Sequence, residues 1–443
     1  MRAKGSGINP RSAAVQALKA VCVDRRSLSS ARSVIDDSPL LPRQRAQAME
    51  LVNGVLRWRG RLEALLAKLL PKPLRRKDTD LQLVLLIALY EINALSTPDY
   101  AIVNEAVNQV RRIGKPWASA MVNAVLRRYI RDEQSLAIMV DQDPVARFAH
   151  PQWLIDRVQQ DWPEQVEQIL MANNQRPPMW LRVNKRKLSV ADYLERLQQQ
   201  KAGATRHRVA EAALTLDRPM GVSQLPGFDQ GLVSVQDAAA QLAPQLLAPQ
   251  DNDLVLDLCA APGGKTCHLL EFAAGIEMTA VDIDPARLKK VRQNLERLNL
   301  QARLIVGDAT DVQSWAEPQH SFDRILVDAP CSASGVIRRH PDIKSLRQPD
   351  DLLALASVQQ QILQQAWTLL RPGGQLLYVT CSVFRMENEQ QIDRLLSAQP
   401  DAESMAIDQD WGIACRHGRQ LLPGVEDGDG FYFALLKKRR KAP

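Results

Sequence analysis

Two cysteines stand directly after stretches of sequence that predict buried strands. Cys331 lies in DAPCSASG (328–335), after an apolar run, and Cys381 lies in YVTCSV (378–383), after a second one. A cysteine thiolate is a strong nucleophile and serves in covalent catalysis. Buried cysteines are also common as small apolar packing residues, and either one alone fits that interpretation equally well. Their matching positions favour a chemical role for the pair.

One reaction that needs a cysteine nucleophile is the methylation of cytosine at carbon 5. That carbon is not electron-rich enough to accept a methyl group unaided, and a thiolate that adds to carbon 6 makes it nucleophilic. Two thiols would let one attack while the other assists departure. Asp328 stands beside them in the sequence and could hold the protonated ring nitrogen or contact a cofactor, and these alternatives stay open.

The segment DLCAAPGGKTCHL (257–269) predicts a strand, a glycine-containing turn and the start of a helix. A phosphate-binding G-x-x-x-x-G-K-[ST] loop would need glycine at Cys259, and Pro262 removes a backbone donor that such a loop uses. The dinucleotide motif G-x-G-x-x-G is absent. S-adenosylmethionine carries no phosphate and needs a close backbone turn, with carboxylates for its sugar and base. The segment therefore favours S-adenosylmethionine.

Two acidic residues stand where those carboxylates would be needed. Asp282 ends the next expected strand, 18 residues after Gly264, where an acidic side chain can accept from ribose hydroxyls. Asp308 ends the strand after that and could accept from the adenine amino group. A single aspartate after a strand is as often only a helix cap or a turn residue. Their order on successive strands makes the joint interpretation stronger.

Strands and helices alternate from residue 253 onwards. This spacing predicts an α/β domain with a doubly wound, mostly parallel sheet covered by helices on both faces. Ligands of such sheets bind at the carboxyl ends of the strands, the edge at which both cysteines are expected. The strands are expected at 254–258, 278–283, 303–306, 324–327 and 376–379, and the helices at 265–273, 285–298 and 353–370.

The 443 residues are enough for about three domains. Residues 1–140 predict an all-helical domain, with a break near Gly60. Residues 150–247 predict a small mixed α/β connector subdomain, in which two prolines exclude helix and a strand follows them. Residues 248–443 form the α/β domain with the cysteines.

The charge is unevenly distributed along the chain. Residues 1–140 hold 23 Lys and Arg against 12 Asp and Glu, an excess of 11, whereas the remainder holds 34 against 38. A basic excess of this size indicates a polyanionic partner, most simply a nucleic acid. A solvated basic face is the plain alternative.

Other features exclude several classes of protein. The six cysteines form no C-x-x-C pair and no grouping with histidine at metal-ligand spacing, so we expect no metal and no disulfide. The first residues lack the apolar core of a signal peptide, and the longest apolar run, 83–90, is too short to span a bilayer. We therefore expect a cytoplasmic protein without a membrane association.

Several motifs together resemble those of the RNA cytosine-C5 methyltransferases. They are DLCAAPGGKT, VDID, DAPCSASG, RRHPD, YVTCSV with ENE, and PGVEDGDGFYFALL. The resemblance covers nearly the whole chain, and the helical front with NNQRPPMWLRVN (173–184) is similar to the bacterial small-subunit rRNA enzymes of that family. It implies a Rossmann-like class I methyltransferase domain, a NusB-like RNA-binding domain at the front, S-adenosylmethionine as cofactor and 16S rRNA as substrate. We expect a monomer.

The resemblance also implies roles for individual residues. The cysteine of the T-C-S segment is the nucleophile of that family, which is Cys381 here, and the P-C-S cysteine, Cys331, helps to release the product. DNA cytosine methyltransferases attack with a Pro-Cys cysteine, so the residues alone would have favoured Cys331. Cofactor contacts are expected at Cys259, Ala260, Ala261, Pro262, Gly263, Gly264, Lys265, Asp282, Asp308 and Asp328, and RNA contacts at Arg182, Arg338, Arg339 and His340.

Two other functions compete with this one. A P-loop ATPase would use the near-match at Gly264, Lys265 and Thr266. A non-catalytic RNA-binding or assembly protein would need only the helical domain. Binding of S-adenosylmethionine without a preference for ATP distinguishes the methyltransferase from both.

Overall fold

The computed structural model describes residues 8–317 and 321–440, and the chain divides into two compact units. One unit comprises Met1–Gln175 together with Ile337–Gln348, and the other comprises Arg176–Val336 together with Pro349–Pro443. The three-domain division expected from the sequence stays a prediction. In the described ranges, no helix combines the length and the apolar character needed to cross a membrane.

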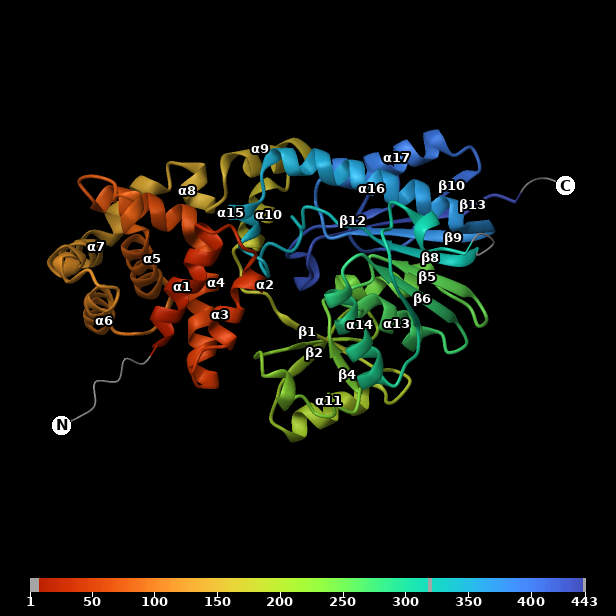
Figure 1. Ribbon diagram of the computed structural model, residues 1–443, viewed down its shortest axis with the longest axis horizontal. Helices are drawn as coiled ribbons and strands as arrows, with labels where there is room; N and C mark the ends of the chain where they lie inside the picture. The colour runs from red at the N-terminus through yellow and green to blue at the C-terminus, as the bar shows by residue number, and fades with distance from the viewer. Residues whose placement is uncertain (1–7, 318–320, 441–443) are drawn as a thin grey trace. The chain divides into compact units, whose positions relative to one another are not determined.

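The first unit is helical, as the sequence predicts (Figure 1). Its central helix is α5, in which all but one of residues 81–91 are buried, because nearly every side chain of that stretch is apolar. The helices are α1 (Pro10–Cys22), α2 (Leu28–Ala31), α3 (Ser33–Asp36), α4 (Pro42–Leu69), α5 (Thr79–Ala94), α6 (Asp99–Arg112), α7 (Ser119–Val140), α8 (Pro144–Phe148), α9 (Gln152–Asp161) and α10 (Val166–Asn173).

Helix α4 runs without interruption, which corrects the break expected near Gly60. A Cβ atom on Gly60 would lie 3.2 Å from the backbone oxygen of Val145 in α8, closer than most side chains approach a carbonyl. Glycine at this position therefore permits the close packing of α8 against α4. The helix itself tolerates glycine at a cost of about 1 kcal/mol relative to alanine.

Residues 337–348 are part of the helical unit and contain the short helix α15 (Ile343–Leu346). The ammonium of Lys344 is buried, and it donates to the backbone oxygen of Arg57 and to Oδ1 of Asn174, the latter at 2.7 Å. Burial, with a contribution from Arg57, lowers the pKa of Lys344 well below its usual value. These contacts tie the segment to α4 and to the end of α10.

The second unit contains two sheets, and the smaller has four antiparallel strands in the order β2-β3-β1-β4. The strand predicted after the two prolines is β1; α11, β2 and β3 were not predicted. The elements are β1 (Met179–Val183), α11 (Val190–Gln199), β2 (Ala204–Arg206), β3 (Ala213–Leu216), β4 (Val233–Val235) and α12 (Ala243–Leu247).

Nine strands of the described residues form the larger sheet, in the order β11-β12-β13-β9-β8-β5-β6-β7, with β10 paired to β13. Strands β5 to β9 are mutually parallel, and β10 to β13 extend the sheet as antiparallel strands. The mostly parallel core confirms the predicted fold class. The strands are β5 (Leu254–Leu258), β6 (Glu277–Asp282), β7 (Arg303–Val306), β8 (Phe322–Asp328), β9 (Leu370–Thr380), β10 (Ala402–Met405), β11 (Ile413–Ala414), β12 (Arg419–Leu421) and β13 (Phe431–Lys438).

Helices cover both faces of this sheet, with α13 and α14 on one face and α16 and α17 on the other (Figure 1). The chain moves outwards through β5, β6 and β7 and then returns to β8 beside β5. The carboxyl ends of these strands form a crevice at that reversal, which is the usual ligand position in open α/β sheets. The helices are α13 (Gly264–Phe272), α14 (Pro285–Leu298), α16 (Pro349–Leu369) and α17 (Glu389–Ala398).

Two glycines meet backbone to backbone where the loop after β8 approaches the start of β13. The N–H of Gly335 donates to the carbonyl of Cys381 (2.9 Å), and the N–H of Gly430 donates to the carbonyl of Gly335 (2.8 Å). A Cβ atom on Gly335 would lie 2.1 Å from the backbone oxygen of Gly430, a distance that atoms do not reach. This contact therefore fixes the loop that carries Cys331 against the loop that carries Cys381.

We predict that Gly335→Ala destabilises the protein by about 1–3 kcal/mol, because the added methyl must displace backbone rather than a flexible side chain. Gly428→Ala is the matched control, since its Cβ would lie 3.4 Å from the nearest atom, an ordinary contact. Its unfolding free energy should change by less than about 0.5 kcal/mol. Urea unfolding of both variants measures the difference; equal stability would show that the two loops are not held by this contact.

Asp257 is fully buried near the end of β5. Its Oδ2 accepts a hydrogen bond from the hydroxyl of Thr266 in α13 (2.6 Å), which links the strand to the helix across the intervening turn. Burial raises the pKa of this carboxyl to about 7, against the lowering effect of the Thr266 hydrogen bond. The folded protein therefore keeps this carboxyl protonated at pH values at which the unfolded chain, with a pKa of about 3.9, ionises it.

This difference predicts a pH-dependent stability. Between pH about 4 and pH about 7 the folded state binds more protons than the unfolded state at Asp257, so the unfolding free energy falls as the pH rises. Asp257→Asn keeps an acceptor for Thr266 and removes the titration. The stability of the variant relative to the parent should therefore increase by on the order of 4 kcal/mol across that range. Parallel curves in chemical unfolding at a series of pH values would contradict this prediction.

Candidate active site

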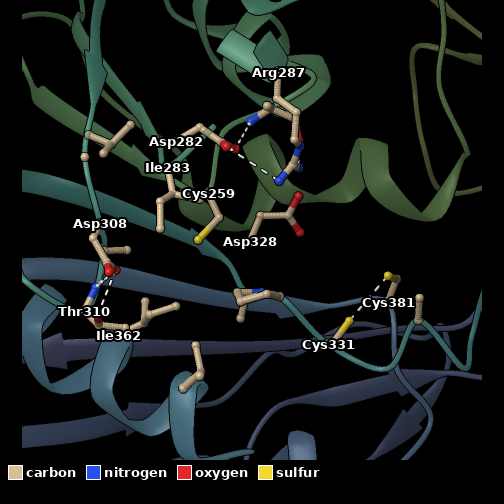
Figure 2. Close-up of a pocket in the computed structure, with 18 residues that line it drawn as sticks. Cys259, Asp282, Ile283, Arg287, Asp308, Thr310, Asp328, Cys331, Ile362 and Cys381 are labelled. Carbon is tan, nitrogen blue, oxygen red and sulfur yellow. Dashed lines mark hydrogen bonds and ion pairs between the residues drawn. The ribbon is translucent and has the colours of Figure 1, made fainter. Parts of the chain in front are cut away.

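A cavity of about 290 Å³ lies at the carboxyl edge of the parallel strands, and Figure 2 shows its lining. Residues that follow β5, β6, β7, β8 and β9 all contribute, together with two side chains of α16. The lining residues are Cys259, Ala261, Val281, Asp282, Ile283, Arg287, Gly307, Asp308, Ala309, Thr310, Asp328, Ala329, Pro330, Cys331, Ala333, Val358, Ile362 and Cys381.

The turn between β5 and α13 forms one wall of the cavity through Cys259 and Ala261. Gly263 closes the turn with a φ of 95° and donates its N–H to the carbonyl of Ala260 (2.7 Å). A Cβ at Gly263 would also lie 3.0 Å from Val291 of α14, so both its backbone angle and its packing require glycine. The other expected contacts of this turn lie outside the lining: Ala260, Pro262, Gly263, Gly264 and Lys265.

Asp282 lines the cavity at the end of β6 and is almost fully buried. Its carboxylate accepts from the N–H of Ala261 (3.0 Å) and from the N–H of Asp284 (3.1 Å), and Arg287 lies 3.5 Å from it. The same arginine donates to the carbonyl of Ala261 (2.8 Å), so Asp282 and Arg287 together brace the β5–α13 turn (Figure 2). A carboxylate has about four acceptor positions, which leaves room for one ligand hydroxyl.

Asp308 lies two residues beyond the end of β7 and also lines the cavity. Its Oδ1 accepts from both the N–H and the hydroxyl of Thr310, at 2.8 and 2.7 Å. Oδ2 has no hydrogen-bond partner within the described part of the chain, so it can accept from a ligand. Ile283, Val358 and Ile362 provide apolar surface near it, and Ile283 is 62% exposed although it is apolar. An apolar wall beside an open carboxylate oxygen suits a flat base with an amino group.

Asp328 ends β8 and forms an ion pair with the buried Lys265, at 2.6 Å. Burial lowers the pKa of Lys265, and the ion pair with Asp328 outweighs it, so the net pKa lies above its usual value. The ammonium also lies 5.3 Å from the centre of the Phe431 ring. The lysine of a phosphate-binding loop would instead face the ligand. Its engagement with Asp328 argues against a phosphate ligand.

The two cysteines meet at the end of the cavity, where the Sγ atoms of Cys331 and Cys381 lie 3.5 Å apart (Figure 2). Cys331 is buried and Cys381 is half-buried. The hydrogen bond with Cys381, together with burial, raises the pKa of Cys331 well above its usual value. The Cys331 thiol is therefore harder to ionise than that of an exposed cysteine.

The four residues expected to contact RNA have different surroundings. Arg182 is 1% exposed, and its guanidinium is paired with Glu271 (2.8 Å) and with the carbonyl of Gly264 (2.7 Å). A guanidinium engaged inside the fold does not meet phosphate, so Arg182 supports the start of α13 in place of the expected RNA contact. Arg338 is likewise buried. Arg339 is half-buried and His340 is exposed, and both remain expectations.

Sequence reasoning missed several side chains of the cavity. Ile283 ends the expected strand 278–283, Arg287 lies in the expected helix 285–298, and Thr310 lies four residues after the expected strand 303–306, but their residue types carry no cofactor signal. Val358 and Ile362 come from α16, where they look like ordinary core positions of a helix. Over residues 8–317 and 321–440, no grouping of three or more His, Cys, Asp or Glu could hold a metal ion.

The family comparisons match three parts of the chain. Residues 244–437 match the family described as 16S rRNA methyltransferase RsmB/F, and residues 150–223 match an RsmF/B-like ferredoxin-like domain. Residues 8–131 match the NusB family. The matches leave out 132–149, which contain the end of α7 and α8, and 224–243, which contain β4.

Similar proteins extend over the whole chain. Two are named ribosomal RNA small subunit methyltransferase B: the one from Vibrio cholerae serotype O1 is 45% identical over 98% of both chains, and the one from Pseudomonas putida is 45% identical over 97% of this chain and 99% of its own. Among solved structures, PH0851 has the same fold, with a TM-score of 0.78 and 23% identity over 98% of this chain and 99% of its own.

A methyltransferase homologue from Pyrococcus horikoshii is 30% identical, with a TM-score of 0.59 over 68% of this chain and 98% of its own. The NusB match falls within the helical unit, and the RsmB/F match covers the strands that carry the cavity. The chain therefore belongs to the family of the 16S rRNA methyltransferases RsmB/F.

Proposed function

We propose that this chain transfers a methyl group from S-adenosylmethionine to carbon 5 of a cytosine in 16S rRNA. Family membership supports the reaction type, and the names of the relatives support the substrate. The observation that carries the chemistry is the pair of cysteine sulfurs 3.5 Å apart at the edge of an acidic cavity. Neither an ATPase nor a purely structural RNA-binding protein needs that arrangement.

The lining of the cavity suits this cofactor. When bound, S-adenosylmethionine supplies an electrophilic methyl group on a positively charged sulfur. Asp282, Asp308 and Asp328 give the cavity acidic character, which favours a cation and disfavours phosphate. We infer that Asp308 accepts from the adenine amino group beside Ile283 and Ile362, and that Asp282 accepts from the ribose while it braces the turn at Cys259 to Lys265.

Cys381 is the nucleophile in this proposal. The thiolate of Cys381 adds to carbon 6 of cytosine, the electron pair of the ring moves to carbon 5, and carbon 5 takes the methyl group. The methyl transfer leaves S-adenosylhomocysteine as the co-product. Transfer of the carbon 5 proton to solvent water and cleavage of the bond between sulfur and carbon 6 then restore the aromatic ring and the thiolate. Cys331 is the more buried of the two, and its hydrogen bond with Cys381 and its burial raise its pKa, so the half-buried Cys381 is the better placed to attack.

Cys331 and Asp328 assist this reaction in different ways. The Cys331 thiol, 3.5 Å from the attacking sulfur, assists the departure of Cys381 from the methylated base. Asp328 is turned towards the cavity by its ion pair with Lys265, where it contacts either the target base or the methionine end of the cofactor. In both cases the Asp328 carboxylate lies beside the reacting atoms. Lys265 is paired with it and is therefore not available to bind phosphate.

The helical unit supplies the RNA partner surface in this proposal. Its basic excess would contact phosphates, and the target cytosine must leave its stack to reach the thiols. We propose that the protein acts on rRNA in the cytoplasm as a monomer. Exposed basic side chains of this unit include Lys72, Arg75, Arg76, Lys77, Arg111, Arg112, Arg127 and Arg128.

The roles of the two cysteines predict different fates for the covalent intermediate. Cys381→Ala should abolish methylation and leave no covalent RNA adduct, because no thiolate remains to add to carbon 6. Cys331→Ala should still attack and methylate, but its release is slowed, so methylated RNA should stay attached to the protein. Cys415→Ala is the control, because Cys415 is a free cysteine outside the cavity.

The measurement is a denaturing gel of each purified variant with substrate RNA and S-adenosylmethionine. A slow-migrating band with Cys331→Ala, absent with Cys381→Ala and with the control, is the expected result. The reverse pattern would mean that Cys331 is the nucleophile.

The cofactor assignment predicts that Asp308→Asn weakens S-adenosylmethionine binding. Asparagine keeps the Oδ1 acceptor for Thr310 and replaces only the open Oδ2, so the substitution isolates the ligand contact. Loss of one charge-assisted hydrogen bond, about 1.5–3 kcal/mol, corresponds to roughly a ten- to a hundredfold weaker Kd by calorimetry. Asp311→Asn, at an exposed neighbour outside the cavity, should bind as the parent does. Equal affinities of the two variants would remove Asp308 from the site.

A further inference from the structure

Each cysteine of the active site is followed directly by a serine, and both serines bind the same buried carboxylate. The hydroxyls of Ser332 and Ser382 each donate to Oε2 of Glu387, and the N–H of Ser332 donates to Oε1 at 2.7 Å. Glu387 is fully buried, in the short turn that precedes α17. One carboxylate therefore joins the loop of Cys331 to the loop of Cys381.

Further hydrogen bonds fix this carboxylate to the sheet and to α16. Nε2 of Gln359 donates to Oε1 of Glu387 (3.1 Å) and to the carbonyl of Pro330 (2.9 Å), next to Cys331. The hydroxyl of Tyr378 in β9 donates to the carbonyl of Glu387 (2.7 Å). Glu387 is thus held from three elements, and its two oxygens accept at least four donors.

Glu387 itself does not line the cavity, so it acts only through its neighbours. Burying a carboxylate is costly unless donors surround it, and removing it would deprive both serine hydroxyls and the N–H of Ser332 of their charged acceptor. A group of this kind is hard to explain as packing, because an apolar side chain of similar size would fill the space without these requirements. Its contacts indicate that Glu387 sets the distance between the loop of Cys331 and the loop of Cys381.

We propose that Glu387 is a positioning residue that holds Cys331 and Cys381 at the separation needed to pass from attack to release. The inference rests on the proposed function. Attack needs Cys381 alone, whereas release needs both sulfurs within hydrogen-bond reach of each other. We call the contacts of Glu387 with Ser332 and Ser382 the clamp. Loss of the clamp therefore slows release more than attack, whereas a general loss of stability does not change the two rates unequally.

The test compares Glu387→Gln with Glu389→Gln, the same change two residues further on. Glu389 is also buried, but it binds Arg385 (2.7 Å) and the N–H of Arg416 (3.1 Å) and neither serine. Single-turnover reactions with saturating RNA and S-adenosylmethionine give the rates of adduct formation and adduct decay, each corrected for the folded fraction by circular dichroism.

The expected result is that Glu387→Gln slows adduct decay by about a hundredfold, the loss that a displacement of about 1 Å can cause, and slows formation less. Methylated RNA should therefore accumulate on the protein, although Cys331 is present. Glu389→Gln should leave the ratio of the two rates unchanged. An unchanged ratio in folded Glu387→Gln would overturn the proposal.

A second variant covers the case in which Glu387→Gln does not fold. Ser332→Ala removes one hydroxyl donor on the Cys331 side and should also slow decay more than formation, whereas an unchanged ratio in this variant overturns the proposal as well. Cys331→Ala is measured in parallel. If it traps no adduct, the proposed function has failed; if it traps one and the clamp variants do not, only the positioning role has failed.

Discussion

The parallel pairing of β8 with β9 is the constraint on which the active site depends. In that pairing Asp328 lies opposite Val379, so Cys331 and Cys381 leave the sheet at the same edge, three and two residues later. Their sulfurs lie 3.5 Å apart although 50 residues separate them in the chain. Ser332 and Ser382 directly follow the two cysteines and therefore also lie close together, so the single carboxylate of Glu387 can bind both. A shift of this register by one residue would separate the thiols and break the clamp together.

The distribution of charge around the cavity determines which ligand it accepts. Three aspartates line it, and the lysine that would serve a phosphate loop is paired with one of them, Asp328. Asp282 is almost fully engaged by the N–H of Ala261 in the β5–α13 turn, by the N–H of Asp284 and by Arg287. The contact with the Asp282 carboxylate therefore holds the turn in place. In a phosphate loop, by contrast, the backbone N–H donors point at the ligand. A segment that nearly matches the phosphate-loop pattern therefore favours a cationic ligand over phosphate.

Much of this architecture could be predicted because apolar runs and strand-end residues are local signals. The five parallel strands, the acidic residues after them and the two cysteines were all visible in the sequence. Strands β10, β11 and β12 were not, because each has four residues or fewer, too short for a periodic pattern to show. Strand β13 and helix α11 were not predicted either. Arg182 was misjudged because its partner Glu271 is 89 residues away, and an arginine looks the same in sequence whether it faces RNA or a buried carboxylate.

Cys331 and Cys381 have equivalent positions in the sheet, but they differ in burial. Both follow parallel strands, both precede a serine and both line the cavity, so strand order does not distinguish them. Cys331 lies deeper and has a raised pKa, whereas Cys381 is open enough to meet a base. Because a buried thiol is costly to ionise, the deeper sulfur suits the proton holder of the proposed reaction, and the shallower one suits its nucleophile. The difference in burial is thus a physical reason, beside the resemblance, for proposing that Cys381 attacks.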